Sequence, residues 1–295
     1  MRIIPNSEFI VNPDGSVFHL HIRPEQLSDK IVMMGDPDRV TLTASFFDSI
    51  ECDVRSREFH TVTGMYKGKR LTALSHGIGT DNIDIVLNEL DALANIDLKQ
   101  RTIKEKHTRL KLIRLGTSGA LQPDIPVGES FLAAKYALGL DGLLHFYADG
   151  SKHMHHEMTN AFVQHMKWNP LLPSPYVVGS SESLMEQLAF DYRKGITATS
   201  PGFYGPQGRV LRLPLSDEGM NKKIESFTFE GQNITNFEME SSALYGLSLM
   251  LGHDALTICL VIANRVTEKF SSNYLPFMEK LIQNTLDRLA GSQSK

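Results

Sequence analysis

The sequence predicts an α/β protein with a largely central sheet, built as a single domain over residues 1–295. Short apolar runs that end in glycine-containing turns alternate along the chain with stretches whose apolar residues recur at helical spacing. No linker rich in Pro, Gly and Ser, no low-complexity run and no internal repeat marks a domain boundary. The 295 residues are enough to bury one large core.

The strands of this sheet are predicted from the short apolar runs. The clearest of these runs are Ile31–Met34, Leu71–Ser75, Leu112–Leu115, Tyr176–Gly179 and Ala255–Ile262. Weaker candidates surround Ser130 and Ile196. The apolar pattern does not predict the order of the strands in the sheet.

Helices are predicted where apolar residues recur every three or four positions. A helix that begins near Thr80 carries one apolar stripe made of Ile83, Val86, Leu87, Leu90, Leu93 and Ala94, which should pack on the sheet. Comparable helices are predicted over His155–Met166, Ser181–Phe190, Ser241–Leu251 and Asn273–Leu289. Each boundary carries a margin of about two to four residues.

The composition excludes several classes of protein. The net charge is −4, with 41% hydrophobic and 22% charged residues and no basic stripe, so nucleic acid is not expected as a partner. The first residues lack the apolar core of a signal peptide, and no apolar stretch is long enough to cross a bilayer. We therefore expect a cytoplasmic protein without a membrane partner. Cys52 and Cys259 have neither metal-ligand nor redox spacing, and we expect both to be small buried residues.

The first predicted strand leads directly into Gly35-Asp36-Pro37-Asp38-Arg39. This order delivers a glycine backbone amide and a guanidinium together at the end of a strand. Glycine allows close backbone approach, and arginine offers a planar fork that matches phosphate, so the segment can bind an oxyanion. Taken alone, Gly-Asp-Pro is more often an ordinary turn.

A second basic residue stands at the end of another predicted strand. Arg114 lies in the apolar run Leu112–Leu115, and Gly116-Thr117-Ser118-Gly119 follows as a loop. Successive N–H groups of such a loop can form a nest for an anion, and a buried arginine needs an anionic partner. A structural pair between arginine and a carboxylate is the alternative, and both interpretations predict that Arg114 is a buried charge.

Two carboxylates, Glu238 and Glu240, stand just before the helix predicted at Ser241. In one interpretation they favour the helix start, where acidic groups meet the positive end of the helix dipole. In the other, a carboxylate at a strand-to-helix junction accepts hydrogen bonds from sugar hydroxyls. The spacing by itself favours the first interpretation.

The loop Phe203-Tyr204-Gly205-Pro206-Gln207-Gly208-Arg209 combines aromatic, amide and guanidinium groups. The glutamine can donate to one base oxygen and accept from an adjacent N–H, the arginine can bond a second oxygen, and Phe203 can pack on the ring. An isolated surface loop with incidental polar residues is the commoner structure.

The histidines suggest no metal site. His153, His155 and His156 lie close together in the sequence, but no carboxylate or cysteine has the spacing of a known metal motif, so we expect a solvated helix start. His76 is expected to be a hydrogen-bonded loop histidine rather than a base.

Taken in order, these segments resemble the nucleoside phosphorylase family over nearly the whole chain. The family pattern begins with a Phe-His-Leu segment and continues through G-D-P-x-R, R-I-G-T-x-G and E-M-E segments. The matching residues are Phe18-His19-Leu20, Gly35 to Arg39, Arg57-Glu58-Phe59, His76-Gly77-Ile78-Gly79, Arg114 to Gly119, Glu238-Met239-Glu240 and Asn264-Arg265. The family's F-Y-x-x-Q-x-R pattern accompanies pyrimidine nucleosides, and Phe203, Tyr204, Gln207 and Arg209 fill it.

The resemblance implies a fold and an assembly. Members have a twisted central mixed sheet flanked by helices, and they form dimers or hexamers with active sites shared between subunits. The implied reaction is phosphorolysis of uridine or a related pyrimidine nucleoside to the free base and ribose 1-phosphate, in nucleoside salvage. Inorganic phosphate is then a co-substrate, and no cofactor or metal is implied.

The resemblance also implies a role for each matched residue. Phosphate would be held by Gly35, Arg39, Arg114 and Thr117, joined by Arg57 of a neighbouring subunit. Ribose would contact Thr117, Met239 and Glu240, with Glu238 nearby and a neighbour's His19 at the 5′-hydroxyl. The base would meet Phe203, Gln207 and Arg209, with Arg265 supporting the pocket. The catalytic set implied is Arg114, Thr117, Gln207, Arg209 and Glu240.

The chain departs from the family pattern at two places. Thr80-Asp81-Asn82 follows Gly79, where many relatives have a Pro-Ser pair. Some bacterial members use that serine and a glutamate for a monovalent cation; Glu58 is retained but Asn82 replaces the serine, so we predict no such site. Gly205-Pro206 also differs from the usual order in the loop that selects the base.

Two other functions stay open at this point. A purine nucleoside phosphorylase or a hydrolytic nucleosidase ranks lower, because purine enzymes usually carry a carboxylate where this loop has Gln207 and Arg209, and hydrolases do not need the phosphate arginines. The third hypothesis is a non-catalytic protein that binds or stores nucleosides on the same fold, since fold alone does not prove turnover.

Overall fold

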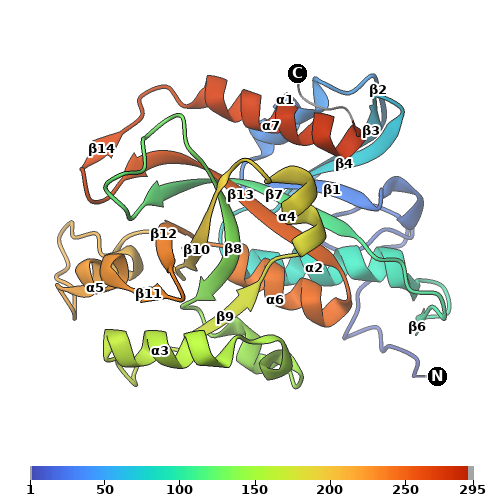
Figure 1. The fold of residues 1–295 in the computed structure, drawn as a ribbon. Coiled ribbons are helices and arrows are strands. Elements are labelled where there is room, and N and C mark those ends of the chain that lie inside the picture. Colours follow the sequence, from blue (N-terminus) through green and yellow to red (C-terminus); the bar gives the residue numbers. More distant parts are fainter. Residues whose placement is uncertain (1, 292–295) are drawn as a thin grey trace.

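The structure is a computed structural model that describes residues 2–291, and its centre is a mixed sheet of twelve strands (Figure 1). In spatial order its main path runs β11 (Thr228–Phe229), β12 (Gln232–Glu238), β10 (Arg193–Thr199), β8 (Phe131–Gly139), β13 (Asp254–Asn264), β7 (Lys111–Ala120), β1 (Lys30–Met34), β4 (Lys69–Ser75), β3 (Phe59–Tyr66) and β2 (Ser49–Ser56). Two further strands, β14 (Lys269–Phe270) and β9 (Tyr176–Gly179), pair with β13 and β8. A separate hairpin joins β5 (Ile96–Asp97) to β6 (Thr102–Ile103).

Part of this sheet closes on itself. β12 pairs in parallel with β10 and antiparallel with β7, so β7, β12, β10, β8 and β13 form a ring. In the closing pair, Phe237 of β12 lies opposite Gly119 of β7. The closure therefore places the end of β12 beside the second half of β7.

Helices cover both faces of the sheet. Figure 1 shows α1 (Pro37–Ala44), α4 (Glu182–Leu188) and α7 (Leu275–Ala290) on one side, and α2 (Thr80–Asn95) with α6 (Ser241–Leu251) on the other. The helices α3 (His156–Met166) and α5 (Met220–Ser226) pack near the end of the sheet that carries β9 and β12. No helix among residues 2–291 has the length and apolar character that crossing a membrane requires.

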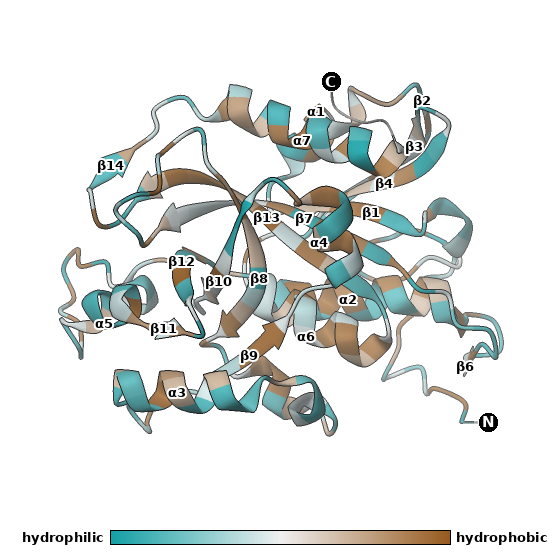
Figure 2. Ribbon diagram, viewed as in Figure 1, coloured by the Kyte–Doolittle hydropathy of each residue, from teal (hydrophilic) through white to brown (hydrophobic). Residues whose placement is uncertain are grey.

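The central strand β1 is apolar from Ile31 to Met34 because these residues are buried on both faces of the sheet. Ile31 and Met33 belong to the core beneath α2 and α6, whereas Val32 and Met34 belong to the core beneath α1, α4 and α7. A strand buried on both faces carries a continuous hydrophobic run rather than an alternating one. In Figure 2 the central strands are largely brown, whereas α3 and α7 carry both teal and brown residues, as expected of helices with one exposed face.

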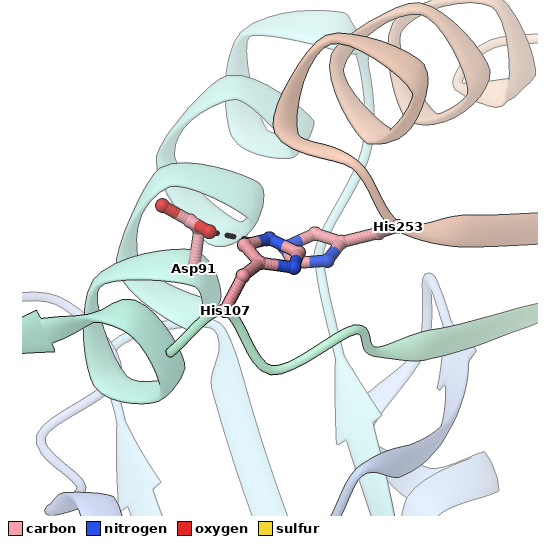
Figure 3. A group of neighbouring side chains, drawn as sticks. All are labelled: Asp91, His107 and His253. Carbon is pink, nitrogen blue, oxygen red and sulfur yellow. Dashed lines mark hydrogen bonds and ion pairs between the residues drawn. The ribbon is translucent and has the colours of Figure 1, made fainter. Parts of the chain in front are cut away.

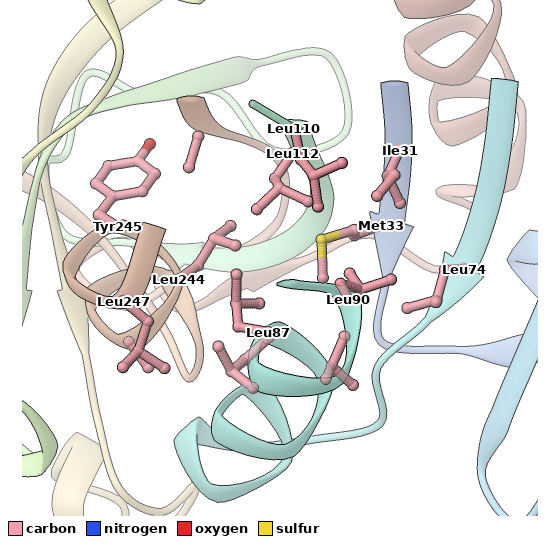
Figure 4. Close-up of a cluster of buried hydrophobic side chains, with 14 of the residues drawn as sticks. Ile31, Met33, Leu74, Leu87, Leu90, Leu110, Leu112, Leu244, Tyr245 and Leu247 are labelled. Atoms are coloured by element: carbon pink, nitrogen blue, oxygen red, sulfur yellow. The ribbon is translucent and has the colours of Figure 1, made fainter. Parts of the chain in front are cut away.

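The core beneath α2 and α6 joins the two helices to the sheet. Leu87 and Leu90 of α2 and Leu244 of α6 meet side chains of β1 and β7 in one cluster (Figure 4). All three leucines are fully buried. This packing holds the start of α6, and with it the segment that contains Glu240, against the sheet.

The α/β class with a mixed sheet flanked by helices is confirmed, and so are most of the predicted elements. The helices predicted near Thr80 and over residues 241–251 are α2 and α6, and the other three helices are found with ends shifted by one or two residues. The runs predicted as strands correspond to β1, β4, β7, β9 and β13, and the two weaker candidates to β8 and β10.

Three long strands and two helices were missed. β3 and β12 are buried, but they bury polar residues such as Thr61, Thr63 and Asn236 among apolar ones, so neither reads as an apolar run. β2 lies at the sheet edge and is largely exposed, and its Ile50, Cys52 and Val54 alternate with polar residues. The helices α1 and α5 are short, with seven or eight residues each.

Three predictions about local structure were wrong. Gly116-Thr117-Ser118-Gly119 is not a loop, because β7 continues through it to Ala120 and pairs with β13 along its length. Gly35-Asp36-Pro37 is not an ordinary turn but the start of α1, with Asp36 as the capping residue whose side chain accepts from the Asp38 amide at 2.9 Å. Cys52 is only partly buried, whereas Cys259 is buried as expected.

The prediction that residues 1–295 form one domain stays a prediction. Its two ends, residue 1 and residues 292–295, lie outside the described residues.

Replacing Leu244 by alanine should lower the free energy of unfolding by about 2–5 kcal/mol, because it leaves a cavity between α6 and the sheet. Leu249→Ala on the same helix, where 37% of the leucine is exposed, should cost less than about 1 kcal/mol. Urea denaturation of both variants measures the difference. Equal losses would mean that α6 does not pack through Leu244.

Candidate functional site

A pocket of about 930 Å³ opens where the ends of several strands meet. The strands β7, β12, β13 and β14, the segment after β1 that begins α1, the turn after β4 and the loop after β10 all line it. Eleven of the thirteen residues predicted for the site line it: Gly35, Arg39, Arg114, Thr117, Phe203, Gln207, Arg209, Glu238, Met239, Glu240 and Arg265. The fold therefore gathers into one cavity residues that lie up to 230 positions apart in the sequence.

Arg114 is the most deeply buried charge of this pocket, with 4% of the residue exposed. Its Nη1 lies 3.0 Å from Glu238 Oε2, and its Nη2 donates to Glu240 Oε2. Burial alone would lower the pKa of Arg114, but the two carboxylates outweigh it and hold this pKa above its ordinary value. Both interpretations of Arg114 predicted a buried charge, and this is confirmed.

The Glu238 carboxylate is almost fully occupied by hydrogen bonds from the protein itself. Its carboxylate accepts hydrogen bonds from the Thr199 hydroxyl at 2.5 Å and from the backbone amides of Glu240 and Ser241 at 2.9 and 3.0 Å. These amides belong to the first turn of α6 and the residue before it, so Glu238 caps the helix as well as pairing with Arg114. The structure favours a supporting role for Glu238 over direct contact with a ligand.

Glu240 is held at the strand-to-helix junction that the sequence predicts. Its Oε1 accepts from the Gly79 amide at 2.8 Å, and its Oε2 accepts from Arg114. A carboxylate oxygen has two acceptor positions, so each oxygen of Glu240 retains capacity for a hydroxyl group. Glu240 is thus oriented by the protein and can still bind a polyol.

Gly35 and Arg39 meet Arg114 on the same side of the pocket. Arg39 Nη1 donates to the Leu115 carbonyl oxygen at 3.1 Å, which anchors the guanidinium to β7. A side chain at position 35 would have its Cβ only 3.0 Å from the Gly77 carbonyl oxygen and 3.6 Å from Arg39 Nη2. Burial and the charge of Arg114 lower the pKa of Arg39. Two guanidiniums that disfavour each other's charge form a site for an anion.

Thr117 and Ser118 extend this site along β7. Both line the pocket, and Ser118 Oγ is buried with no hydrogen-bond partner among residues 2–291. The sequence interpretation placed these hydroxyls in a loop that forms a nest of amides. In the structure the amides of a β-strand pair with neighbouring strands instead, so the partly exposed Thr117 offers a ligand its side chain rather than a nest of amides.

The loop after β10 forms the other side of the pocket. The Arg209 guanidinium stacks on the Phe203 ring at 3.8 Å from its centroid, and Nη1 donates to Gln207 Oε1 at 2.5 Å. Because the Gln207 oxygen accepts from Arg209, its amide N–H groups are left for a ligand. Gln207 is buried, whereas Phe203 is half exposed. The loop is therefore organised by contacts among its own residues.

Arg265 adds a second positive charge beside Arg209. It follows β13, and its stem packs against Gly119 of β7. Burial and the neighbouring charge of Arg265 lower the pKa of Arg209 to about 10, so the Arg209 guanidinium remains charged at neutral pH. This side of the pocket is suited to a group that carries or gains negative charge.

His19 and Arg57 are the two predicted residues that do not line this pocket. His19 is held by Glu89, whose carboxylate lies 2.7 Å from His19 Nδ1 and also accepts from the His19 and Leu20 amides. Arg57 lies in the turn between β2 and β3, 5.5 Å from the Phe18 ring. Both residues had been assigned to a neighbouring subunit, and that assignment stays a prediction.

His76 is a pocket neighbour whose importance the sequence interpretation underrated. It is fully buried, and its Nε2 accepts from Arg114 Nε at 3.3 Å. Burial, together with the charges of Arg114 and Arg39, holds the pKa of His76 well below its ordinary value. The expectation of a hydrogen-bonded loop histidine is met, but its partner is the central arginine of the site.

Several pocket residues had no role in the sequence interpretation. Ile78, Ile262, Ala263 and Phe270 supply apolar wall, and Asn264 binds the Gln122 and Ile125 carbonyl oxygens behind it. Their position in the sequence was the available signal, because Ile262 ends a predicted strand and Ala263 separates it from the Asn264-Arg265 motif.

One group of side chains in the described part of the chain has the composition of a metal site. Asp91, His107 and His253 offer ligand atoms within 4.8 Å of one another (Figure 3). His253 Nδ1 accepts from the Leu110 amide at 3.2 Å, so its proton is on Nε2, which faces Asp91 at 3.1 Å. The two rings are stacked at 5.4 Å, and a metal bound in the plane of one ring lies outside the plane of the other. These contacts favour a hydrogen-bonded junction over a metal centre.

The histidines that precede α3 take the predicted place. His155 caps the helix, its side chain accepting from the Met158 amide at 3.3 Å, and His156 is exposed. The predicted helix start is confirmed.

The pocket therefore holds three kinds of group. Arg39 and Arg114 can bind an oxyanion, Glu240 can accept from hydroxyl groups, and the Gln207 and Arg209 loop can hold a planar ring. This combination suits an enzyme that transfers a polyol from a ring to an inorganic oxyanion.

The chain belongs to the Phosphorylase superfamily, whose family model matches residues 29–289. It is 30% identical over 263 residues to a uridine phosphorylase of Thermococcus kodakarensis, covering 87% of this chain and 80% of that protein. It is also 25% identical over 248 residues to a purine nucleoside phosphorylase of the DeoD type from Streptococcus suis, covering 82% of this chain and 84% of that one.

A solved structure from Trypanosoma brucei is similar over nearly the whole fold. It is a nucleoside phosphorylase described as showing uridine phosphorylase activity, with a TM-score of 0.88 and 28% sequence identity. The match covers 96% of this chain and all of that one. This similarity agrees with the predicted family and fold.

Replacing Glu238 by glutamine should destabilise the protein by about 2–4 kcal/mol, because an amide cannot accept from Thr199, two backbone amides and Arg114 together. The matched control is Glu230→Gln, an exposed glutamate just before β12. Thermal and urea unfolding measure both. A variant as stable as the control would show that Glu238 is not the structural anchor described above.

Proposed function

We propose that this protein cleaves uridine, or a closely related pyrimidine nucleoside, with inorganic phosphate to give the free base and ribose 1-phosphate. The observation that carries the proposal is the division of one pocket into an arginine pair, Arg39 with Arg114, and an amide-guanidinium pair, Gln207 with Arg209. Uridine phosphorylases among the relatives support the same reaction. Its place is in nucleoside salvage.

Phosphate takes the end of the pocket that contains Gly35, Arg39, Arg114 and Thr117. The guanidiniums supply charge and directed donors, and Gly35 leaves room for an oxyanion beside its backbone. Arg57 of a partner subunit completes this set. Arg114 stays paired with Glu240 and can still direct one Nη2 hydrogen toward phosphate.

Ribose lies between phosphate and the base. Its hydroxyl groups donate to Glu240 and contact Thr117 and Met239, while Glu238 orients Arg114 and the start of α6. His19 of a partner subunit binds the 5′-hydroxyl group. The Glu240 carboxylate also offsets the positive charge that develops on the sugar.

The base lies against Phe203 and is read by Gln207 and Arg209. The Gln207 amide nitrogen donates to one base oxygen, and Arg209 approaches another, with Arg265 adding positive charge. A pyrimidine with two carbonyl oxygens matches these donors. A purine base would instead call for a carboxylate at this position.

The chemistry proceeds through separation of charge. As the bond from C1′ to the base nitrogen breaks, its electron pair goes to the base, and the sugar becomes cation-like. A phosphate oxygen then forms the new bond at C1′, while Arg209 and Gln207 stabilise the departing anion. Each well-placed donor can contribute about 3 kcal/mol to such a transition state, and the fixed phosphate adds a proximity effect.

The catalytic set is Arg114, Thr117, Gln207, Arg209 and Glu240. Phosphate acts as co-substrate, so the reaction balances without a cofactor or a metal. The active form is a homo-oligomer, a dimer or a hexamer, because the site needs His19 and Arg57 from a partner. The cytoplasmic location and the lack of a nucleic-acid partner stay predictions from composition.

The two other functions differ from this one in what they require. A hydrolytic nucleosidase binds no phosphate and does not require Arg39 beside Arg114. A purine enzyme does not require the Gln207 and Arg209 donors for its base. A protein that only binds nucleosides would not keep phosphate ligands and base ligands facing one pocket. The purine nucleoside phosphorylases among the relatives make inosine the necessary comparison substrate.

Purified protein should release uracil from uridine only when phosphate is present, and inosine should not be cleaved. Arg209→Ala should lower kcat/KM by about 10²–10³-fold, since it removes a donor to the leaving base. The absorbance change of glycosidic cleavage measures both rates. Arg212→Ala in the same loop is the control, because Arg212 is exposed and does not line the pocket. Turnover without phosphate, or an unaffected Arg209→Ala variant, would contradict the proposal.

Mixing two inactive variants tests the shared site. Arg57→Ala and Arg114→Ala should each lose most activity as pure proteins. After the two are unfolded and refolded together, mixed dimers contain one intact site, so about a quarter of wild-type activity should return. If Arg57 acts within its own chain, no mixed oligomer has an intact site and no activity returns.

A further inference from the structure

His76 lies at the centre of the cationic end of the pocket without being one of its predicted ligands. It follows β4, and its backbone amide donates to the Met34 carbonyl oxygen of β1 at 2.8 Å. Its ring is fully buried, and its Cε1 and Arg39 Nη2 lie 3.8 and 3.6 Å from the position that a Cβ on Gly35 would take. The imidazole is therefore wedged among Gly35, Arg39 and Arg114.

The contact with Arg114 determines which nitrogen of His76 carries the proton. Arg114 Nε always bears a hydrogen, so His76 Nε2, at 3.3 Å, can only be the acceptor. A neutral ring then has its proton on Nδ1, which has no hydrogen-bond partner among residues 2–291. Burial and the two adjacent arginines lower the pKa of this histidine, which keeps it in the neutral form.

Arg114 needs this acceptor because its other donors point elsewhere. Its two terminal nitrogens face Glu238 and Glu240, and its Nη1 also reaches Cys259 Sγ at 3.7 Å. The Nε hydrogen has His76 Nε2 as its acceptor and would be buried unpaired without it. An unpaired buried donor on a charged group costs more than an ordinary lost hydrogen bond.

The neutrality of the acceptor matters as much as its position. A carboxylate at this place would also accept from Arg114 Nε, but it would add a third negative charge to those of Glu238 and Glu240 and would repel an oxyanion. Imidazole holds the guanidinium and adds no negative charge.

We propose that His76 is a positioning residue for the oxyanion site, holding the Arg114 guanidinium in the orientation that binds phosphate without adding negative charge to the site. The proposal rests on the proposed function, because it takes phosphate as the oxyanion. It gives His76 no role as a proton donor or acceptor in the reaction.

Three variants separate this role from the alternatives. His76→Leu removes the acceptor, His76→Gln can return an uncharged acceptor oxygen near the place of Nε2, and His253→Leu removes a buried histidine whose hydrogen bonds lie outside the pocket. For each protein, uridine phosphorolysis gives kcat and separate KM values for phosphate and uridine between pH 6 and pH 8. Thermal unfolding reports the stability of the same samples.

We expect His76→Leu to raise the KM for phosphate by about tenfold, with a change of less than about threefold in the KM for uridine. His76→Gln should restore the KM for phosphate to within about threefold of the wild-type value, with an unchanged pH profile. His253→Leu should lose stability and leave the KM for phosphate as it was.

Other results would overturn the proposal. If both His76 variants lose kcat equally and the acidic limb of the pH profile disappears, His76 is a base. If the two KM values rise together and His76→Gln does not restore the KM for phosphate, its role is only structural. Wild-type protein that does not cleave uridine with phosphate would defeat the proposed function itself, a result distinct from active wild-type protein with unaffected His76 variants.

Discussion

The site depends on one buried ion cluster, in which the Arg114 guanidinium is held between the carboxylates of Glu238 and Glu240. Removing such charges from water costs several kcal/mol per ion, and this is offset only when every partner is well placed. Here the partners are fixed by separate elements. Glu238 ends β12, Glu240 precedes α6, Arg114 lies on β7, and the closure of β12 onto β7 brings them together.

The same cluster joins the fold to the pocket. Glu238 caps α6 and accepts a hydrogen bond from the Thr199 hydroxyl of β10. The orientation of Arg114 therefore depends on contacts with a helix, a strand and a turn together. The two carboxylates fix the position of Arg114 and together offset its single positive charge. The uncompensated positive charge that an oxyanion meets is therefore that of Arg39, whose guanidinium is tied to β7 through the Leu115 carbonyl oxygen. A preorganised arrangement of this kind needs little rearrangement when a ligand binds.

The sequence predicted the elements with strong periodic signals and most of the residues that line the pocket. Apolar residues dominate the buried positions of the helices α2 and α6 and the strands β1 and β13, so their pattern is clear. The strands β3 and β12 bury hydroxyl and amide groups that are paired across the sheet, such as Thr63 with Thr72, and no local pattern reveals such pairing. The continuation of β7 through Gly116-Thr117-Ser118-Gly119 was missed because glycine usually marks a turn, whereas here β13 pairs with it.

The sequence alone also could not assign separate functions to individual side chains of the same type. Glu238 and Glu240 look alike in the sequence, but the hydrogen bonds around each differ, and only Glu240 keeps clear capacity for a hydroxyl group. His76 looked like an ordinary loop histidine because its partner, Arg114, is 38 positions away. Both distinctions arise from the tertiary structure, which brings distant backbone and side-chain groups together.

The central claim is that a phosphate oxygen, bound beside Arg39 and Arg114, forms the new bond at C1′ of the nucleoside. Incubation of the protein with uridine and ¹⁸O-labelled phosphate, followed by ³¹P nuclear magnetic resonance, tests it directly. We expect ribose 1-phosphate that retains all the label of the phosphate, formed in proportion to the uracil released. Free ribose that carries an oxygen from water would contradict this account.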